Sequence, residues 1–137
     1  MTADDFPVVI HHNPKCGTSR DVVAMVEAAG YPPTIDLYLQ TGWTAAQLRN
    51  LAARAGLSIR DLMREKGTPA AELGLLDSAV SDEAILAAMV EHPILVNRPI
   101  VETPKGVRLC RPSEQVLDLL DRRPESFTKE DGEVVKL

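Results

Sequence analysis

Hydrophobic positions recur along this chain at two different spacings, and the spacing predicts which segments are strands and which are helices. Pro7–Ile10 (PVVI) is a short apolar run with β-branched residues, so it predicts a buried strand. After the loop HHNPKCGTS, a helix ending at Gly30 is predicted by the apolar positions Val22, Met25, Val26 and Ala29. Thr34–Leu39 predicts a second strand, and strand–helix–strand in this order predicts a βαβ unit with parallel strands.

The middle of the chain carries helical patterns instead. Thr44 with Gln47 forms a capping box before an apolar stripe that ends at Gly56. A shorter helix is predicted over Ser58–Glu65 and a longer one from Ser81 to Glu91. Residues 66–80 contain two glycines and a proline, which predicts an irregular segment. We treat the stretch 42–80 as a helical insert.

The last third returns to short extended runs, at Ile94–Val96, Ile100–Glu102 and Val107–Cys110. The turn signal 104–106 (PKG) predicts that the last two form an antiparallel hairpin. A final helix is predicted to open at 112–114 (PSE), and the tail 124–137 is expected to dock loosely. This element order predicts one α/β domain over residues 1–137 with a mixed sheet.

Composition narrows the class of protein. The chain has 137 residues, of which 45% are hydrophobic and 26% charged, which excludes a disordered chain or a coiled coil. A net charge of −5 argues against a nucleic-acid or membrane-surface partner. The acidic N-terminus does not fit a signal peptide, and we find no apolar run long enough to span a bilayer. With two cysteines and no disulfide framework, we expect a soluble protein of a reducing cytoplasm.

The sharpest motif is 13–20 (NPKCGTSR), between the first predicted strand and helix. A cysteine there faces free backbone N–H groups and the positive end of the helix dipole, which lower its pKa and favour the thiolate. Thr18 and Ser19 are expected to cap the helix, while Lys15 and Arg20 add positive charge. The polar context favours Cys16 as a nucleophile over an inert buried cysteine.

No second thiol lies three residues after Cys16, because Ser19 occupies that position. The other cysteine, Cys110, lies in a strand pattern and is expected to be a small core residue. Redox chemistry at Cys16 would therefore need a thiol from another molecule. The three histidines lack partners at metal-ligand spacing, so no metal site is predicted.

Three blocks of sequence together resemble one family. They are 12–20 (HNPKCGTSR), 92–101 (HPILVNRPIV) and 108–114 (RLCRPSE), and the likeness runs from Val8 to the tail block 127–132 (FTKEDG). In these blocks the chain is similar to the glutaredoxin-dependent bacterial arsenate reductases, the ArsC family.

The resemblance implies a thioredoxin-like fold and a cytoplasmic oxidoreductase of arsenic detoxification. We expect the protein to be a monomer. In that family the cysteine, here Cys16, forms a covalent adduct with arsenate, which leaves as arsenite. Glutathione, a co-substrate and not a bound cofactor, attacks the adduct, and glutaredoxin removes the glutathione. The histidine that supports the cysteine falls on His12. The three arginines around the oxyanion fall on Arg64, Arg98 and Arg111.

The residues agree with an anion site, because an arginine fork can hold two oxygens of a tetrahedral oxyanion at once. Taken one by one, they leave alternatives open. Arg64 also fits a helix surface, and Arg111 could pair with Glu114. His12 is not distinguished from His11 by spacing. The resemblance also makes Pro99 a candidate for a cis peptide bond.

Two other functions stay open. One is a glutathione-dependent thiol reductase with a different substrate, since arsenate and phosphate differ little in size and charge. The other is a redox regulator that binds RNA polymerase. Such regulators use a Cys-x-x-Cys switch, which Ser19 excludes here, and they need no arginines to clamp an anion.

Overall fold

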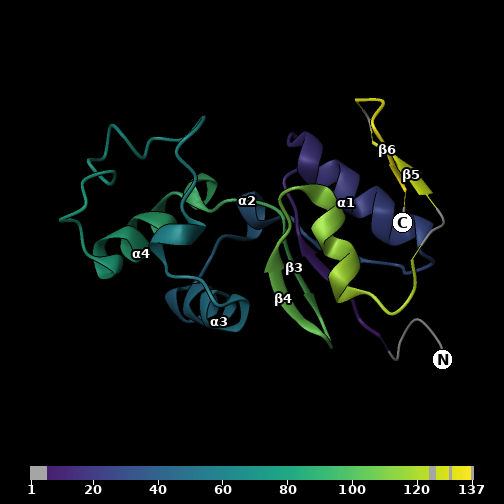
Figure 1. Ribbon diagram of the computed structural model, residues 1–137. Helices are drawn as coiled ribbons and strands as arrows, with labels where there is room; N and C mark the ends of the chain where they lie inside the picture. Colours follow the sequence, from purple (N-terminus) through teal and green to yellow (C-terminus); the bar gives the residue numbers. More distant parts are fainter. Residues whose placement is uncertain (1–5, 124–125, 130, 137) are drawn as a thin grey trace. The chain divides into compact units, whose positions relative to one another are not determined.

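The computed structural model describes residues 6–123, 126–129 and 131–136 (Figure 1). The chain divides into two compact units. The first is made of Met1–Leu37 and Arg98–Leu137, and the second of Tyr38–Asn97.

The first unit is built on a four-stranded sheet in the order β2-β1-β3-β4. The strand β1 (Val9–His11) runs parallel to β2 (Thr34–Asp36) and antiparallel to β3 (Ile100–Thr103). β3 in turn forms an antiparallel hairpin with β4 (Gly106–Leu109). The predicted parallel pair, the hairpin and the mixed sheet are therefore confirmed.

Two helices pack on this sheet and against each other: α1 (Gly17–Ala28) and the 3-10 helix η4 (Ser113–Leu119). The apolar positions predicted for α1 are all buried, and they join one core cluster with Ile10 of β1, Val101 of β3 and Val116 of η4. Burying a valine, isoleucine or methionine side chain of this cluster contributes about 1.5–3 kcal/mol. This core anchors β1 and α1, and with them the loop between the two that carries Cys16.

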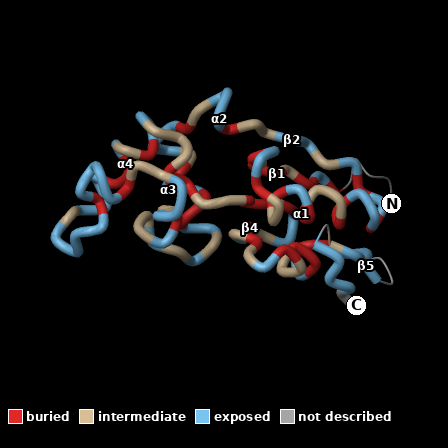
Figure 2. Tube along the Cα trace, turned by 90° about the horizontal axis from the view of Figure 1, so that it is seen from above, coloured by how far each residue is buried: buried red, intermediate tan, exposed pale blue. Residues whose placement is uncertain are grey.

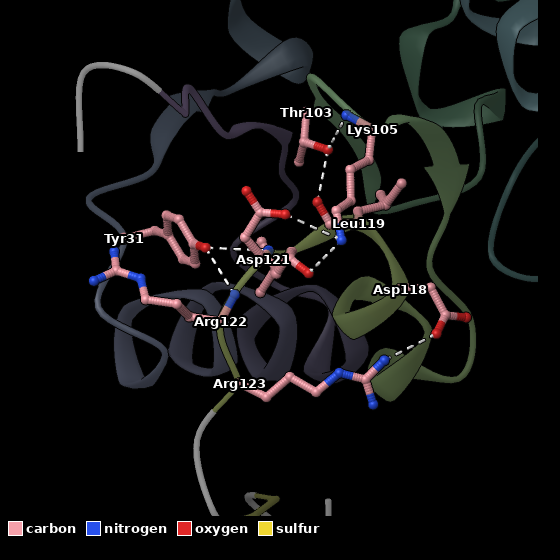
Figure 3. A network of polar contacts seen from close by, with 9 residues as sticks. Tyr31, Thr103, Lys105, Asp118, Leu119, Asp121, Arg122 and Arg123 are labelled. Atoms are coloured by element: carbon pink, nitrogen blue, oxygen red, sulfur yellow. Dashed lines mark hydrogen bonds and ion pairs between the residues drawn. The ribbon is translucent and has the colours of Figure 1, made fainter. Parts of the chain in front are cut away.

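A network of hydrogen bonds holds the end of η4 and the residues after it (Figure 3). The Tyr31 hydroxyl accepts hydrogen bonds from the backbone N–H groups of Asp121 (3.1 Å) and Arg122 (2.9 Å). Thr103 donates to the carbonyl of Leu119 at 2.7 Å. These contacts tie the chain after η4 both to the loop following α1 and to β3.

The second unit is helical, as predicted. It contains α2 (Tyr38–Thr41), α3 (Ala45–Ala55), the 3-10 helix η2 (Arg60–Leu62), α4 (Asp82–Glu91) and the 3-10 helix η3 (Pro93–Leu95). Thr44 caps α3 by accepting from the Gln47 N–H at 3.1 Å, and Gly56 ends α3 in the left-handed conformation (φ 71°). Ser81 caps α4 in the same way through the Ala84 N–H.

Residues 66–80 form no helix or strand, which confirms the predicted irregular segment. Most of them are exposed, as the pale blue stretches in Figure 2 show. The Arg60 guanidinium holds the later part of the segment by donating to three backbone carbonyls, those of Leu75, Asp77 and Val80.

Several predicted elements were wrong in type or length. The strand from Thr34 stops at Asp36, because Tyr38 turns into α2 and is buried with its ring stacked on Trp43 at 5.0 Å. The helix over Ser58–Glu65 shrinks to the 3-10 turn η2. The run Ile94–Val96 is not a strand: residues 93–95 form η3, which begins at the proline before the run.

The predicted helix after Cys110 exists, as the 3-10 helix η4. The described part of the tail contains an antiparallel pair that the pattern did not predict, β5 (Ser126–Thr128) and β6 (Val134–Lys136). In the described ranges, every helix is too short or too polar to cross a membrane.

Candidate functional site

Cys16 lies where the loop after β1 turns into α1, and the loop is held by bonds within itself. The Cys16 N–H donates to the carbonyl of Asn13 at 3.0 Å, closing a four-residue turn with Pro14 at its second position. The side chain of Asn13, which is buried, accepts from the Lys15 N–H at 3.0 Å. Cys16 is the N-cap of α1 and only 8% exposed, so the predicted position at a helix start is confirmed.

The surroundings of Cys16 favour its thiolate. Burial alone would raise the pKa of the Cys16 thiol, but three donors outweigh it and lower the pKa below its ordinary value. These donors are the Ser19 backbone N–H and the side chains of Arg98 and Arg111, with the positive charge of Arg98 adding to the effect. Arg111 Nη1 lies 3.6 Å from the Cys16 sulfur.

Arg98 and Arg111 come together although they lie 13 positions apart in the sequence. Arg111 Nη1 donates to the carbonyl of Arg98 at 2.9 Å, which fixes the Arg111 side chain beside the sulfur. Each of these arginines is followed by a cis peptide bond, Arg98–Pro99 and Arg111–Pro112. The cis bond at Pro99 confirms the expectation, whereas the one at Pro112 had no sequence signal.

The suggested pairing of Arg111 with Glu114 is replaced by another ion pair. The Glu114 carboxylate lies 2.7 Å from the ammonium group of Lys129, which belongs to the tail. Glu114 also heads the causes that raise the pKa of Lys129. Lys129 thus neutralises an acidic group that comes three residues after Arg111 in the sequence.

His12 contacts Ser19. Its Nδ1 lies 2.5 Å from the Ser19 hydroxyl, and that hydroxyl also accepts from the Asn13 N–H at 3.1 Å. Ser19 therefore does not cap α1 with its side chain, as the sequence had suggested, but turns back to the loop. Burial, followed by the positive charge of Arg20, lowers the pKa of His12, so its ring is neutral at pH 7.

His11 is distinguished from His12 by its partners. It is buried at 3% exposure, with Nδ1 lying 2.8 Å from Asp36 on β2 and Nε2 lying 2.6 Å from Glu102 on β3. These contacts join β1 to both neighbouring strands at the end where the Cys16 loop begins. Sequence reasoning missed this cluster, because the two carboxylates lie 25 and 91 residues away from His11.

Arg64 lies in the second unit, just after η2. Its backbone N–H donates to the carbonyl of Leu95 at 2.7 Å, and its guanidinium donates to Asn97 Oδ1 (3.2 Å) and to the carbonyl of Lys66 (3.0 Å). Asn97 is the residue before Arg98 in the sequence. The structure thus gives Arg64 a defined place within its own unit, and its part in anion binding stays a prediction.

The environment of Cys110 has the opposite effect on the thiol pKa from that of Cys16. It is fully buried in the core cluster, and burial raises the pKa of its thiol to about 12. Such a thiol stays protonated at neutral pH. Its prediction as a small core residue is confirmed.

The site therefore combines a buried thiol of lowered pKa with two guanidinium groups and the N–H groups at the start of α1. This arrangement can hold a small tetrahedral oxyanion against a sulfur nucleophile. Across the part of the chain that the structure describes, no three His, Cys, Asp or Glu side chains are grouped to hold a metal ion.

A family model and named relatives point to the same family of proteins. Residues 11–119 match the ArsC family. An arsenate reductase of Synechocystis sp. is 60% identical over 93% of this chain and 92% of its own length. An arsenate reductase of Rhizobium meliloti is 57% identical over 93% of this chain and 92% of its length.

A solved structure supports the same family. The arsenate reductase from Vibrio cholerae superposes with a TM-score of 0.80 at 45% identity, covering 84% of this chain and 98% of that one. The expected thioredoxin-like fold class is confirmed by this likeness.

Proposed function

This chain belongs to the ArsC family, and from that premise we propose that it reduces arsenate to arsenite with Cys16 as the nucleophile. The observation that carries the proposal is the contact of the Cys16 sulfur with a guanidinium donor at the start of α1: Arg111 Nη1 lies 3.6 Å from the sulfur. The Ser19 N–H and the Arg98 and Arg111 side chains act together to lower the pKa of Cys16. The same donors suit an incoming oxyanion, since arsenate presents several acceptor oxygens to planar guanidinium forks.

In the first step the Cys16 thiolate attacks arsenic(V). A sulfur–arsenic bond forms, and one arsenate oxygen leaves as water after taking up protons. Arg98 and Arg111 stabilise the negative charge that builds on the oxygens during this exchange. No electrons have moved to arsenic at this stage.

In the second step glutathione supplies the other thiol. Its thiolate attacks the Cys16 sulfur, and the sulfur–arsenic bond breaks with its electron pair on arsenic. Arsenic(V) thereby becomes arsenic(III) and leaves as arsenite, while Cys16 and glutathione form a mixed disulfide. A glutaredoxin thiolate then takes the glutathione and restores the Cys16 thiol.

Thiols from other molecules are needed because the chain has no second reactive cysteine near Cys16. Ser19 stands where a dithiol enzyme would carry its second cysteine, and Cys110 is buried and protonated. We extend the proposal to Arg64 as a third oxyanion ligand and to His12 as the support of the thiolate. We further propose that the enzyme is a cytoplasmic monomer.

The test is NADPH consumption with arsenate, glutathione, glutathione reductase and glutaredoxin. We expect arsenate-dependent turnover by the native chain and a loss of at least about 1000-fold in Cys16→Ser, as for removal of other covalent nucleophiles. An unchanged melting temperature controls for folding.

The opposite outcomes are equally informative. Turnover retained by Cys16→Ser would overturn the mechanism. If the native chain turns over glutathione mixed disulfides but not arsenate, the alternative of a glutathione-dependent thiol reductase takes its place.

A further inference from the structure

The loop bearing Cys16 contains a buried hydroxyl that joins His12 to the nucleophile. The Ser19 side chain is 0% exposed, and its oxygen lies 2.5 Å from His12 Nδ1 and 3.1 Å from the Asn13 nitrogen. Hydrogen bonding from the backbone N–H of the same residue is one of the causes that lower the pKa of Cys16. Ser19 thus touches His12 with its side chain and Cys16 with its backbone.

The direction of the His12–Ser19 hydrogen bond follows from counting donors. A serine hydroxyl has one hydrogen and two lone pairs, and the Asn13 N–H takes one of those lone pairs. Among the described residues that bond Ser19 Oγ, His12 Nδ1 is the one able to accept its hydrogen. A neutral imidazole that accepts at Nδ1 carries its own hydrogen on Nε2.

The backbone of Ser19 is free to serve the sulfur because of its place in α1. Ser19 is the third residue of the helix, and the N–H groups of a helix's first residues have no partner within the helix. The hydroxyl of Ser19 is held from two sides, by His12 and by the Asn13 N–H, in the turn that follows Cys16. Arg98 and Arg111 supply the positive charge beside the sulfur.

We propose that Ser19 is a positioning residue through which His12 acts on Cys16. His12 and the Asn13 N–H hold the Ser19 hydroxyl, and this holds the Ser19 N–H on the thiolate. The inference rests on the proposed function in one respect, that Cys16 is the nucleophile. In this proposal His12 exchanges no proton with the substrate.

The first test reads the ring hydrogens of the native chain, and it uses a variant only to assign the signals. Nitrogen-15 NMR of the native chain labelled at histidine reports which ring nitrogen carries the hydrogen, and His12→Gln identifies the His12 signals. We expect hydrogen on Nε2 and an unprotonated Nδ1 at neutral pH. Hydrogen on Nδ1 would overturn the proposal, since Ser19 could not then donate to the ring.

The second test is a double-mutant cycle on Ser19→Ala and His12→Ala. The readout is the rate at which iodoacetamide alkylates Cys16 across pH, with kcat/KM for arsenate measured alongside. Each single change is expected to move the midpoint of alkylation to higher pH and to lower kcat/KM by about three- to tenfold, the net worth of one hydrogen bond. The double variant should lose no more than either single variant, because both changes break one chain of contacts.

A matched control separates this effect from a general loss of stability. Ser81→Ala removes the serine N-cap of α4 in the second unit, so it costs stability without touching the Cys16 loop. It should leave the alkylation midpoint unchanged. Additive losses in the double variant, or a native alkylation profile in Ser19→Ala, would overturn the proposal. Alkylation and NMR need no arsenate turnover, so these results stay separate from a failure of the proposed function.

Discussion

The two cysteines of this chain show how differently one fold can treat the same side chain. Cys16 is 8% exposed and Cys110 is 0% exposed, so both are buried by any ordinary measure. Nevertheless, the pKa of Cys16 is lowered, whereas that of Cys110 rises to about 12. Burial penalises the thiolate at both positions and is the largest single influence at each.

The difference comes from the donors that surround each sulfur. Cys16 has the Ser19 N–H and two guanidinium groups, whereas Cys110 has apolar neighbours and the backbone carbonyl of Arg108, which cannot donate. Cys110 and Arg111 are adjacent in the sequence, and Cys110 enters the core while Arg111 reaches the Cys16 sulfur. The comparison teaches that nearby hydrogen-bond donors can outweigh the effect of burial on a thiol pKa, whereas a deeply buried thiol without such donors keeps its proton.

The largest expected effect is in direct labelling of the two thiols. At pH 7, iodoacetamide should modify Cys16 at least about 100-fold faster than Cys110, because the thiolate is the reactive form. As pH falls, Cys16 should keep reacting below its ordinary pKa of 9.0, since its own pKa is lower. Peptide mass spectrometry measures both rates, and equal labelling in denaturant is the control. Similar labelling rates of Cys16 and Cys110 in the native chain would contradict the difference between their pKa values.

The next effect concerns the geometry of the donors. Arg98→Lys keeps the positive charge but removes the planar fork, so we expect kcat/KM for arsenate to fall by about 10- to 100-fold. The matched control is Arg108→Lys, an arginine on β4 that pairs with Asp118 on the surface and should be nearly silent. A silent Arg98→Lys would argue against bidentate binding of the oxyanion.

A smaller effect is expected at the inert thiol. Cys110→Ser places a hydroxyl in an apolar core and should cost about 1–3 kcal/mol of the free energy of unfolding. Activity should stay within about twofold of the native value, because this thiol takes no part in the chemistry. Urea unfolding and the coupled NADPH assay measure the two quantities. Lost activity in a folded Cys110→Ser variant would favour an internal disulfide relay.

The same residue gives stability a pH dependence of known sign. The folded pKa of Cys110 is raised, so its contribution is fully present below the unfolded pKa of 9.0 and is lost as pH rises from 9.0 toward about 12. Cys110→Ala should therefore lose less stability between pH 8 and pH 10 than the native chain does. An identical loss in both proteins, measured by urea unfolding, would contradict the raised pKa.

The smallest expected effect concerns the ion pair of Lys129 with Glu114 and its influence on the charge of Arg111. Lys129→Met leaves the Glu114 carboxylate without its 2.7 Å partner, and Glu114 comes three residues after Arg111. We expect Glu114 to draw on the charge of Arg111 and to raise KM for arsenate by about two- to threefold. Lys129→Met combined with Glu114→Gln should restore the native KM. No recovery in that pair would show that Lys129 acts only on the fold.

The sequence predicted most of the framework because the framework depends on local signals. The apolar spacing predicted α1, the capping pattern of Thr44 with Gln47 predicted the start of α3, and the glycine turn predicted the β3–β4 hairpin. It failed at Ile94–Val96, since a short apolar run fits a strand and a buried 3-10 turn equally well. It also missed β5 and β6, whose few residues carry no sustained period.

The sequence alone predicts the reactive position. A cysteine between a buried strand and a helix, followed by glycine and two hydroxyl residues, predicts a thiolate at the helix start, because helix N–H groups are a local property of the chain.

The partners that come from far along the chain depend on the tertiary structure. It brings Arg98 and Arg111 to Cys16, and it turns Ser19 toward His12 and not toward the helix end. It also separates His11 from its neighbour by placing it between Asp36 and Glu102. Such contacts join strands and helices through packing, and packing leaves no periodic trace in the order of the residues.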